Sequence, residues 1–172
     1  MRILGIDPGS RVLGYGVVQW QKKIPYFVTC GVIRVGEYTD FSVRLKYIFE
    51  GLTEIIQTHL PEEVAIEQVF MHQNASAALK LGHARGAAMV AAVMQNKIVA
   101  EYSARQIKQA VVGYGNAEKT QVQEMVRSLL QLDRTPQADA ADALAAALCH
   151  GQCRQGMMGD WAQQNYKQGR VQ

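Results

Sequence analysis

The chain opens with a short apolar run that ends in an acidic residue. Residues 3–6 are followed by Asp7, and Pro8-Gly9 then interrupts the run before a second strand-like segment begins. A buried strand that ends in this way places one carboxylate at the edge where open α/β sheets bind their ligands. Asp-Pro-Gly is also common turn chemistry. Asp7 alone is therefore equally compatible with a turn cap and with a site residue.

Hydrophobic periodicity predicts ten elements along the chain. Strands are expected at residues 3–7, 15–20, 26–35, 64–70 and 97–101, and helices at residues 41–60, 74–94, 103–108, 117–132 and 135–150. Asn74, Asn116 and Thr135 are the expected N-caps. Short loops join the first three strands, which predicts an antiparallel meander, and a crossover helix would make the fourth strand parallel to the first. This order indicates an α/β fold in which helices flank a mixed five-stranded sheet.

One domain accounts for most of the sequence. The chain has 172 residues, 48% of them hydrophobic, and we assign residues 1–150 to a single core. Residues 151–172 are rich in glutamine and glycine and are predicted to form a disordered tail. No apolar run is long enough to cross a bilayer, and no signal peptide is recognisable, so we expect a cytoplasmic protein. Its three cysteines lack paired spacing and are expected to be reduced, and its net charge of +3 permits a polyanionic partner without requiring one.

Four acidic residues are the candidates for chemistry. Asp7 and Glu67 lie at or near the ends of the first and fourth strands, which would meet at one sheet edge if parallel. Asp139 and Asp142 are three residues apart on the last helix and share one face. Acids near a helix N-terminus also stabilise the macrodipole without any further role. We favour a functional role because alanines flank both acids and no lysine or arginine accompanies them, so the helix can lie close to the sheet.

Converging carboxylates with no buried cation to neutralise them repel one another strongly. A divalent metal ion relieves this repulsion, and a ligand set made only of oxygen atoms favours Mg²⁺ or Mn²⁺ over zinc. Two such ions about 4 Å apart would clamp the attacking and leaving oxygens of an in-line phosphoryl displacement. The residues alone therefore predict metal-dependent phosphodiester chemistry.

Seven short motifs, in order along residues 1–150, resemble the RuvC Holliday junction resolvase family. The first four are Ile-Leu-Gly-Ile-Asp-Pro-Gly-Ser-Arg from residue 3, Gly-Tyr-Gly-Val from residue 14, Ala-Ile-Glu-Gln-Val-Phe from residue 65 and Ala-Leu-Lys-Leu-Gly-His-Ala-Arg-Gly from residue 78. The others are Ala-Arg-Gln-Ile-Lys-Gln from residue 104, Gly-Asn-Ala-Glu-Lys-Thr-Gln-Val-Gln from residue 115 and Pro-Gln-Ala-Asp-Ala-Ala-Asp-Ala from residue 136. Together they are far more specific than any one of them.

The resemblance implies a ribonuclease H-like fold, a homodimer and Mg²⁺-dependent symmetric nicking of four-way DNA junctions in recombination and repair. Mn²⁺ would substitute for Mg²⁺, and two ions are expected in each site. By position, the four acids match the family's catalytic metal-binding residues: Asp7, Glu67, Asp139 and Asp142. The implied reaction is attack by a metal-activated water that leaves ligatable 5′-phosphate and 3′-hydroxyl ends. A thymine-rich cleavage site and branch-migration partners resembling RuvA and RuvB are also implied.

Several further residues match positions that the family uses on DNA. Lys108 and Lys119 match basic residues near the cleaved strand, although a helix lysine is more often simply solvated. Phe70 matches an aromatic residue at the junction centre, where a ring can stack on an unpaired base; the alternative is a core ring at a strand end.

The predicted helix over residues 74–94 also carries candidate DNA-binding residues. Lys80 and Arg85, with His83, lie on this helix beside a stripe of small residues at positions 78, 82 and 86. The resemblance places the dimer contact on this helix, so the stripe would serve the interface and the basic residues the DNA. The alternative is intramolecular packing with a solvated polar face.

Two other functions remain open from the sequence. Asp-x-Gly followed by Gly-x-Gly also resembles the first phosphate loop of sugar kinases and actin-like ATPases, whose duplicated domains need more residues than this chain has. A junction-binding protein without catalysis is the other alternative, but all four acids are present.

Overall fold

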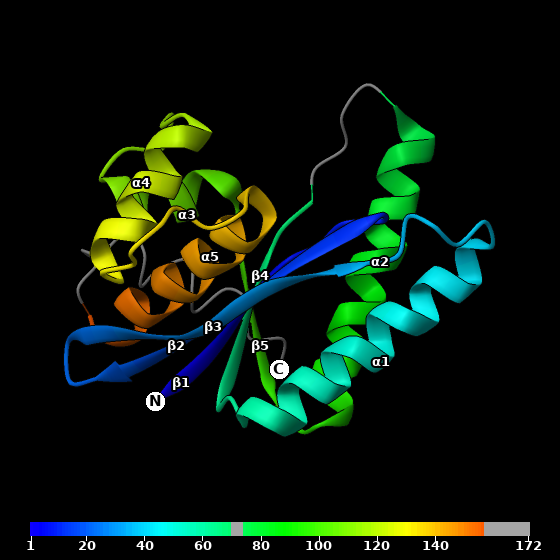
Figure 1. Ribbon diagram of the computed structural model, residues 1–172, viewed down its shortest axis with the longest axis horizontal. Coiled ribbons are helices and arrows are strands. Elements are labelled where there is room, and N and C mark those ends of the chain that lie inside the picture. Colours follow the sequence, from blue (N-terminus) through cyan, green and yellow to red (C-terminus); the bar gives the residue numbers. More distant parts are fainter. Residues whose placement is uncertain (70–73, 157–172) are drawn as a thin grey trace.

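The computed structural model describes residues 1–69 and 74–156 (Figure 1). Five strands form one sheet: β1 (Arg2–Asp7), β2 (Val12–Gln21), β3 (Ile24–Arg34), β4 (Glu63–Glu67) and β5 (Ile98–Tyr102). Five helices surround it: α1 (Phe41–His59), α2 (Ala75–Met94), α3 (Ala104–Val112), α4 (Lys119–Leu129) and α5 (Ala138–Arg154). The predicted α/β class and the order of the ten elements are confirmed.

The sheet has the strand order β3-β2-β1-β4-β5. The first three strands form the antiparallel meander that their short connections predict, whereas β4 runs parallel to β1 and β5 runs parallel to β4. The β1–β4 register pairs Ile6 with Ile66, one residue before each strand ends in an acid. The carboxyl ends of β1 and β4 therefore lie at the same edge of the sheet.

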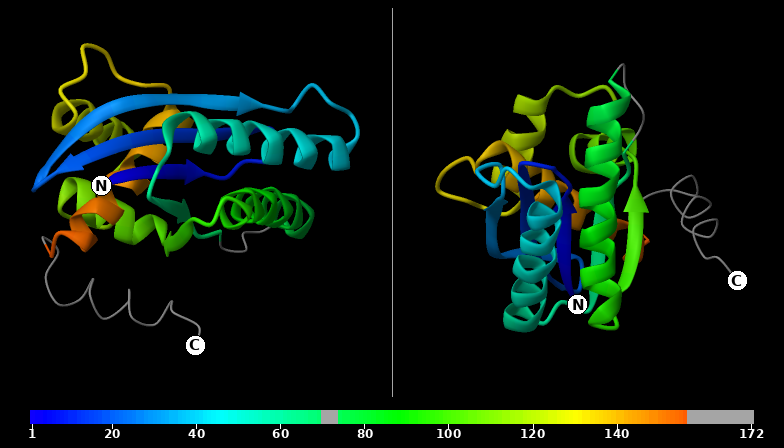
Figure 2. Two further views of the ribbon diagram at one scale, coloured as in Figure 1. Left: turned by 90° about the horizontal axis from the view of Figure 1, so that it is seen from below. Right: turned by 90° about the vertical axis from the view of Figure 1, so that its right-hand side faces the viewer.

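Helices cover both faces of the sheet (Figure 1 and Figure 2). On one face, α3, α4 and α5 enclose a core that includes Ile107, Val126 and Leu144. On the other face, α1 and α2 enclose a second core around Ile48 and Leu52. The sheet is thus buried on both sides, which fixes the position of its edges relative to the helices.

α5 lies almost backbone to backbone against β1 and β2. A methyl group at Gly5 would come within 1.9 Å of the Ala143 carbonyl oxygen, and one at Gly14 within 2.0 Å of the Asp139 carbonyl oxygen. Gly5 also pairs with Gly16 across the two strands, which leaves a smooth surface under the helix. The close packing predicted from the alanines of α5 is confirmed, and glycines in the strands supply the other half of the contact.

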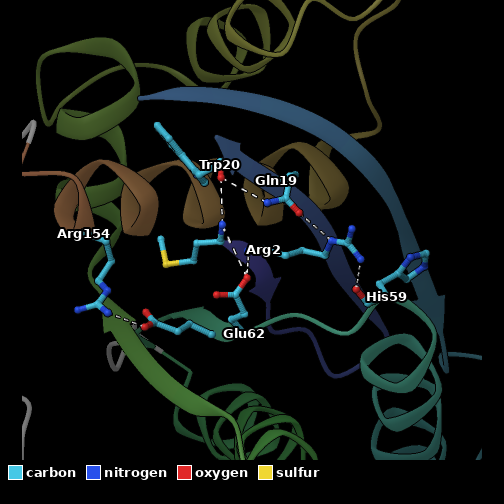
Figure 3. A network of polar contacts seen from close by, with 8 residues as sticks. Arg2, Gln19, Trp20, His59, Glu62 and Arg154 are labelled. Atoms are coloured by element: carbon cyan, nitrogen blue, oxygen red, sulfur yellow. Dashed lines mark hydrogen bonds and ion pairs between the residues drawn. The ribbon is translucent and has the colours of Figure 1, made fainter. Parts of the chain in front are cut away.

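A polar network fixes the opposite edge of the sheet, where β1 and β4 begin (Figure 3). Arg2 Nη1 donates to the His59 carbonyl oxygen at the end of α1 (2.6 Å), and the Arg2 backbone N–H donates to the Glu62 carboxylate (2.9 Å). Arg154, at the end of α5, pairs with Glu63 at 2.9 Å. These contacts tie the crossover helix α1 and the start of β4 to β1, and so stabilise the parallel register.

The first residues of α4 and α5 differ from the prediction. α4 begins at Lys119 rather than at residue 117, because Glu118 rather than residue 116 takes the N-cap position. α5 begins at Ala138 rather than at residue 135, since Thr135 Oγ1 donates to Glu124 on α4 (2.9 Å) and does not cap α5. Thr135 therefore belongs to the loop before α5, and Gln137 takes the N-cap position.

The end of α5 also differs from the prediction. The helix continues to Arg154, four residues beyond the predicted end at residue 150. His150 is fully buried, with its Nδ1 2.7 Å from the Tyr102 hydroxyl and its Nε2 2.5 Å from the Glu63 carboxylate, which holds this last turn against the core. Residues 157–172 of the predicted tail lie outside the described residues. No helix in the described parts of the chain is long and apolar enough to span a membrane.

Candidate active site

The ends of β1 and β4 deliver two acids to one cavity. Asp7 is the last residue of β1, and Glu67 is the last residue of β4. Both side chains line a cavity of about 220 Å³ at this edge of the sheet. The convergence that the parallel strands predict is confirmed.

α5 brings the second pair of acids to the same place. Asp139 and Asp142 lie in its first two turns, and Asp142 lines the cavity with Asp7 and Glu67. The backbone of Asp139 packs on Gly14, which is the β2 partner of Asp7. Three of the predicted acids therefore border the cavity directly, and the fourth lies close enough for its charge to act on Asp7.

Two lysines complete the polar lining of the cavity. Lys108 lies in the middle of α3, and Lys119 is the first residue of α4. Both side chains line the cavity, and Lys119 Nζ donates to Asp142 Oδ2 at 3.1 Å. The rest of the lining is apolar: Ala104, Ile107 and Val122. Helices α3 and α4 therefore supply the positive charge, and the sheet and α5 supply the negative charge.

The environment of Asp7 disfavours its charge. Burial, followed by the charges of Asp142, Glu67 and Asp139, raises the pKa of Asp7 to about 8, although Lys119 opposes the shift. Burial and the charge of Asp142 also raise the pKa of Glu67. Uncompensated negative charge at a partly desolvated site is typical of a site that takes up protons or cations.

Lys119 supplies part of the positive charge beside the acids. Its hydrogen bond to Asp142 raises the pKa of Lys119. However, the Lys119 side chain is 72% exposed, so water screens this pairing. Four carboxylates and two ammonium groups still leave two negative charges when all are ionised, which one divalent cation would balance.

The chemistry of the donor set suits a hard divalent cation. No three carboxylate, histidine or cysteine side chains within residues 1–69 and 74–156 are grouped closely enough to form a ready-made metal cage. The cavity nevertheless offers only carboxylate oxygens as potential ligands, from Asp7, Glu67 and Asp142. Oxygen donors with excess negative charge favour Mg²⁺ or Mn²⁺, and these residues fit such an ion.

The raised pKa of Asp7 predicts that the metal-free protein loses stability as the pH rises. An aspartate with a pKa of about 8 in the fold and 3.8 as its ordinary value binds a proton more tightly when folded. Its stabilising contribution is therefore complete below about pH 4 and is lost as the pH rises to about 8. We expect urea unfolding in EDTA to give a free energy of unfolding lower by roughly 4 kcal/mol at pH 8 than at pH 5. In Asp7→Asn this decline should largely disappear, and an unchanged decline would contradict the burial of an ionisable Asp7.

The remaining DNA-binding candidates have different surroundings. Phe70 lies outside the described residues. Lys80 is exposed on α2, whereas His83 packs edge-on against Phe41 with ring centroids 5.9 Å apart. Arg85 is engaged within the fold, because its Nε donates to the Glu67 carbonyl oxygen at 3.2 Å. Of the two cations on α2, Lys80 is therefore exposed, whereas Arg85 is partly buried and bound to its own chain.

Two features of the site were not predicted from the sequence. Arg85 contacts the backbone of Glu67, and nothing in the local pattern around either residue indicates this long-range contact. The second feature is that Gly14 and Gly16 of β2 pack against α5. Because both glycines lie within a strand under this helix, they do not form a phosphate-binding loop of the kind found in sugar kinases. Their Gly-x-Gly spacing, read together with the alanines of α5, is the signal that would have indicated the close contact.

Comparisons with known proteins agree with the motifs. The model of the family described as crossover junction endodeoxyribonuclease RuvC matches residues 3–150. A relative with that description from Legionella pneumophila subsp. pneumophila (strain Philadelphia 1) is 56% identical over 155 residues, which cover 90% of this chain and 89% of the relative. Another from Hahella chejuensis is 51% identical over 171 residues, 99% of each chain.

Solved structures show the same similarity. Thermus thermophilus RuvC superposes with a TM-score of 0.82 at 36% identity, covering 91% of this chain and 97% of that one. The T. thermophilus RuvC in complex with Holliday junction substrate gives the same TM-score and identity over 87% of this chain and 92% of that one. These matches confirm the ribonuclease H-like fold that the resemblance implies. The chain belongs to the RuvC family of crossover junction endodeoxyribonucleases.

Proposed function

We propose that this protein resolves four-way DNA junctions by paired, symmetric, Mg²⁺-dependent nicks, in homologous recombination and DNA repair. The observation that carries the proposal is the cavity where carboxylates from β1, β4 and α5 face two lysines from α3 and α4. A relative at 36% identity over most of its length is a RuvC in complex with a Holliday junction substrate, which supports the same substrate class here.

Asp7, Glu67 and Asp142 would hold the Mg²⁺ ions, with Asp139 beside them. Mn²⁺ would substitute, and two ions in each site would suit an in-line displacement. When bound, the metal supplies an activated water and offsets the negative charge of the scissile phosphate. The raised pKa of Asp7 means that metal binding displaces a proton, so the apparent affinity for Mg²⁺ should fall as the pH falls below about 8.

The basic residues would bind the cleaved strand. Lys108 and Lys119 line the same cavity as the acids, so their ammonium groups can reach a phosphate placed there and stabilise the charge that develops during cleavage. Lys80, exposed on α2, would contact the DNA backbone further away. Phe70 would stack on an unpaired base at the junction centre.

A nicking assay on a synthetic four-way junction tests this function. With Mg²⁺, we expect one nick in each of two opposing strands, at symmetric positions, with ends that a ligase can seal. EDTA should abolish the nicks, and a linear duplex of the same sequence should stay intact. Junction binding without nicks in either Mg²⁺ or Mn²⁺ would favour the non-catalytic alternative.

An exposed apolar face on α2 supports a homodimer. Leu79, Val90 and Val93 are more than half exposed, and they recur with Gly82 and Gly86 every three or four residues along one side of the helix. A Cβ atom at Gly82 or Gly86 would meet nothing within 4 Å, so the rest of the described chain does not cover this face. Because two matched nicks need two sites, a second copy of α2 related by a two-fold axis is the partner that fits.

Gly86→Leu is expected to weaken this dimer and spare the fold. The substitution has free space in the single chain and improves helix propensity, but it would hold two facing helices apart. We expect the dissociation constant, measured by sedimentation equilibrium, to rise at least about tenfold, since overpacking costs about 1–3 kcal/mol. Glu54→Leu adds the same group on the exposed side of α1 and should leave the dimer unchanged. An unaltered dimer in Gly86→Leu would rule out the α2 interface.

Partners resembling RuvA and RuvB would deliver the junction by branch migration. Because the substrate would be chromosomal DNA, we expect the protein to act in the cytoplasm. A thymine-rich cleavage site is the expected preference.

A further inference from the structure

Arg85 connects α2 with the ends of two strands. Its Nε donates to the Glu67 carbonyl oxygen at 3.2 Å, and its guanidinium group pairs with the Glu101 carboxylate on β5. Only 20% of the Arg85 side chain is exposed. A guanidinium group offers donors in a rigid fork, so one side chain can hold both acceptors at once.

The carbonyl that Arg85 binds belongs to the residue whose carboxylate lines the cavity. The β1–β4 pairing ends at Ile6 and Ile66, so Glu67 lies one residue beyond that ladder. On the β5 side, the Gln68 N–H donates to the Tyr102 carbonyl oxygen (2.8 Å), which is the last such bond among the residues before position 70. The chain then leaves the sheet, and Arg85 is the side chain that braces this exit point from α2.

The charge of Arg85 is already committed to Glu101. Pulling the guanidinium group away to a phosphate would leave the Glu101 carboxylate without this cation and the Glu67 carbonyl oxygen without this donor. Lys80, on the same helix, is exposed, and among residues 1–69 and 74–156 it has no ion pair to lose. Arg85 is therefore suited to hold its own chain together, and Lys80 is suited to contact DNA.

We propose that Arg85 is a positioning residue: together with Glu101 it fixes the backbone of Glu67, and so sets the carboxylate of Glu67 for metal binding. Arg85 contributes little to DNA affinity. The inference rests on the proposed role of Glu67 as a metal ligand, and it connects the helix of the proposed dimer contact with the metal site of the same chain.

Arg85→Lys tests the proposal because it keeps the positive charge and removes the fork. A lysine carries all its donors on one flexible nitrogen, so it cannot reproduce the two fixed donor positions of the guanidinium group. We expect the dissociation constant for Mn²⁺, titrated without DNA, to rise about tenfold, as is typical when a group that supports a metal ligand is lost. The Mg²⁺ concentration for half-maximal nicking should rise in parallel. Junction affinity in EDTA, and its dependence on salt, should stay as in the wild type.

Two further variants make the test independent of folding defects. Glu101→Gln removes the negative charge that holds the Arg85 guanidinium group, and we expect it to weaken Mn²⁺ binding in the same direction. Arg127→Lys alters an arginine of an exposed ion pair with Glu124 on α4, and should change neither metal nor junction binding. Melting temperatures in EDTA show whether each variant is folded. If Arg85→Lys melts at a clearly lower temperature than the wild type, the Mn²⁺ affinity of Glu101→Gln becomes the test of the proposal.

The possible results distinguish three cases: Arg85 positions Glu67, Arg85 contacts DNA, or the proposed nuclease function is wrong. Wild-type Mn²⁺ affinity in both Arg85→Lys and Glu101→Gln would overturn the proposal. Weaker junction binding with unchanged Mn²⁺ affinity would overturn it in favour of a phosphate contact. If the wild type binds Mn²⁺ but never nicks a junction, the proposed function fails, while the brace is still measured by Mn²⁺ affinity.

Discussion

Asp7→Asn should abolish junction cleavage and preserve junction binding. The substitution removes a carboxylate that lines the cavity with Glu67 and Asp142, and an amide is a far weaker ligand for Mg²⁺. Loss of several kcal/mol of metal-dependent stabilisation corresponds to a decrease in the nicking rate of about a thousandfold or more. Binding in EDTA should be unchanged or tighter, because one negative charge near the phosphate is gone. Gel-based cleavage and fluorescence anisotropy measure the two quantities.

The same variant should make the metal-free protein more stable at neutral pH. Burial and three neighbouring acids disfavour the charge of Asp7, and asparagine avoids that cost. Asp133→Asn is the matched control, since Asp133 is exposed between α4 and α5 and does not line the cavity. It should leave cleavage, binding and stability as in the wild type. Wild-type cleavage by Asp7→Asn would contradict the assignment of Asp7 as a metal ligand.

Gly14→Ala is expected to have the second large effect, through the position of α5. The new methyl group would come within 2.0 Å of the Asp139 carbonyl oxygen, so the first turn of α5 must move away from β2. That turn carries Asp139 and is followed at once by Asp142. A displacement of about 1 Å at a reacting centre can cost about a hundredfold in rate, and we expect a loss of this order. The free energy of unfolding should also fall by about 1–3 kcal/mol.

Two controls separate geometry from stability in Gly14→Ala. Gly36→Ala places a methyl group whose nearest neighbours, at 3.2 Å or more, belong mainly to the flexible Arg11 side chain, so it should be nearly silent. Raising the Mg²⁺ concentration at a temperature where Gly14→Ala is fully folded should recover only part of the activity. Wild-type cleavage and Mg²⁺ dependence in Gly14→Ala would show that α5 is not held in place by this contact.

The element order and the sheet topology could be predicted because they depend on local patterns. Alternating apolar residues and helical spacing identify the strands and helices, and short loops require the antiparallel meander. The start of α5 could not be predicted this way: Thr135, the expected N-cap, bonds instead to Glu124 on another helix, and Gln137 takes the N-cap position. Its extension to Arg154 likewise depends on burial of His150 against Glu63 and Tyr102.

The four acids of the candidate site could be identified from strand ends and helix spacing, but their electrostatics could not. The ion pair between Lys119 and Asp142 joins residues 23 positions apart and changes how the negative charge is balanced. The hydrogen bond from Arg85 to the Glu67 carbonyl oxygen could not be predicted from hydrophobic periodicity either, because it depends on how α2 lies against β4 and β5. Sequence patterns identified the acids, whereas the contacts that orient them required the packed fold.

Anomalous diffraction from crystals of the protein with a four-way junction, soaked in Mn²⁺, would locate the metal directly. We expect an anomalous peak within coordination distance of the Asp7 carboxylate, shared with Glu67 or Asp142, and next to a backbone phosphate. The peak should disappear in crystals of Asp7→Asn. A Mn²⁺ peak that never contacts Asp7, in crystals whose junction Mn²⁺ has cut, would contradict the proposed site.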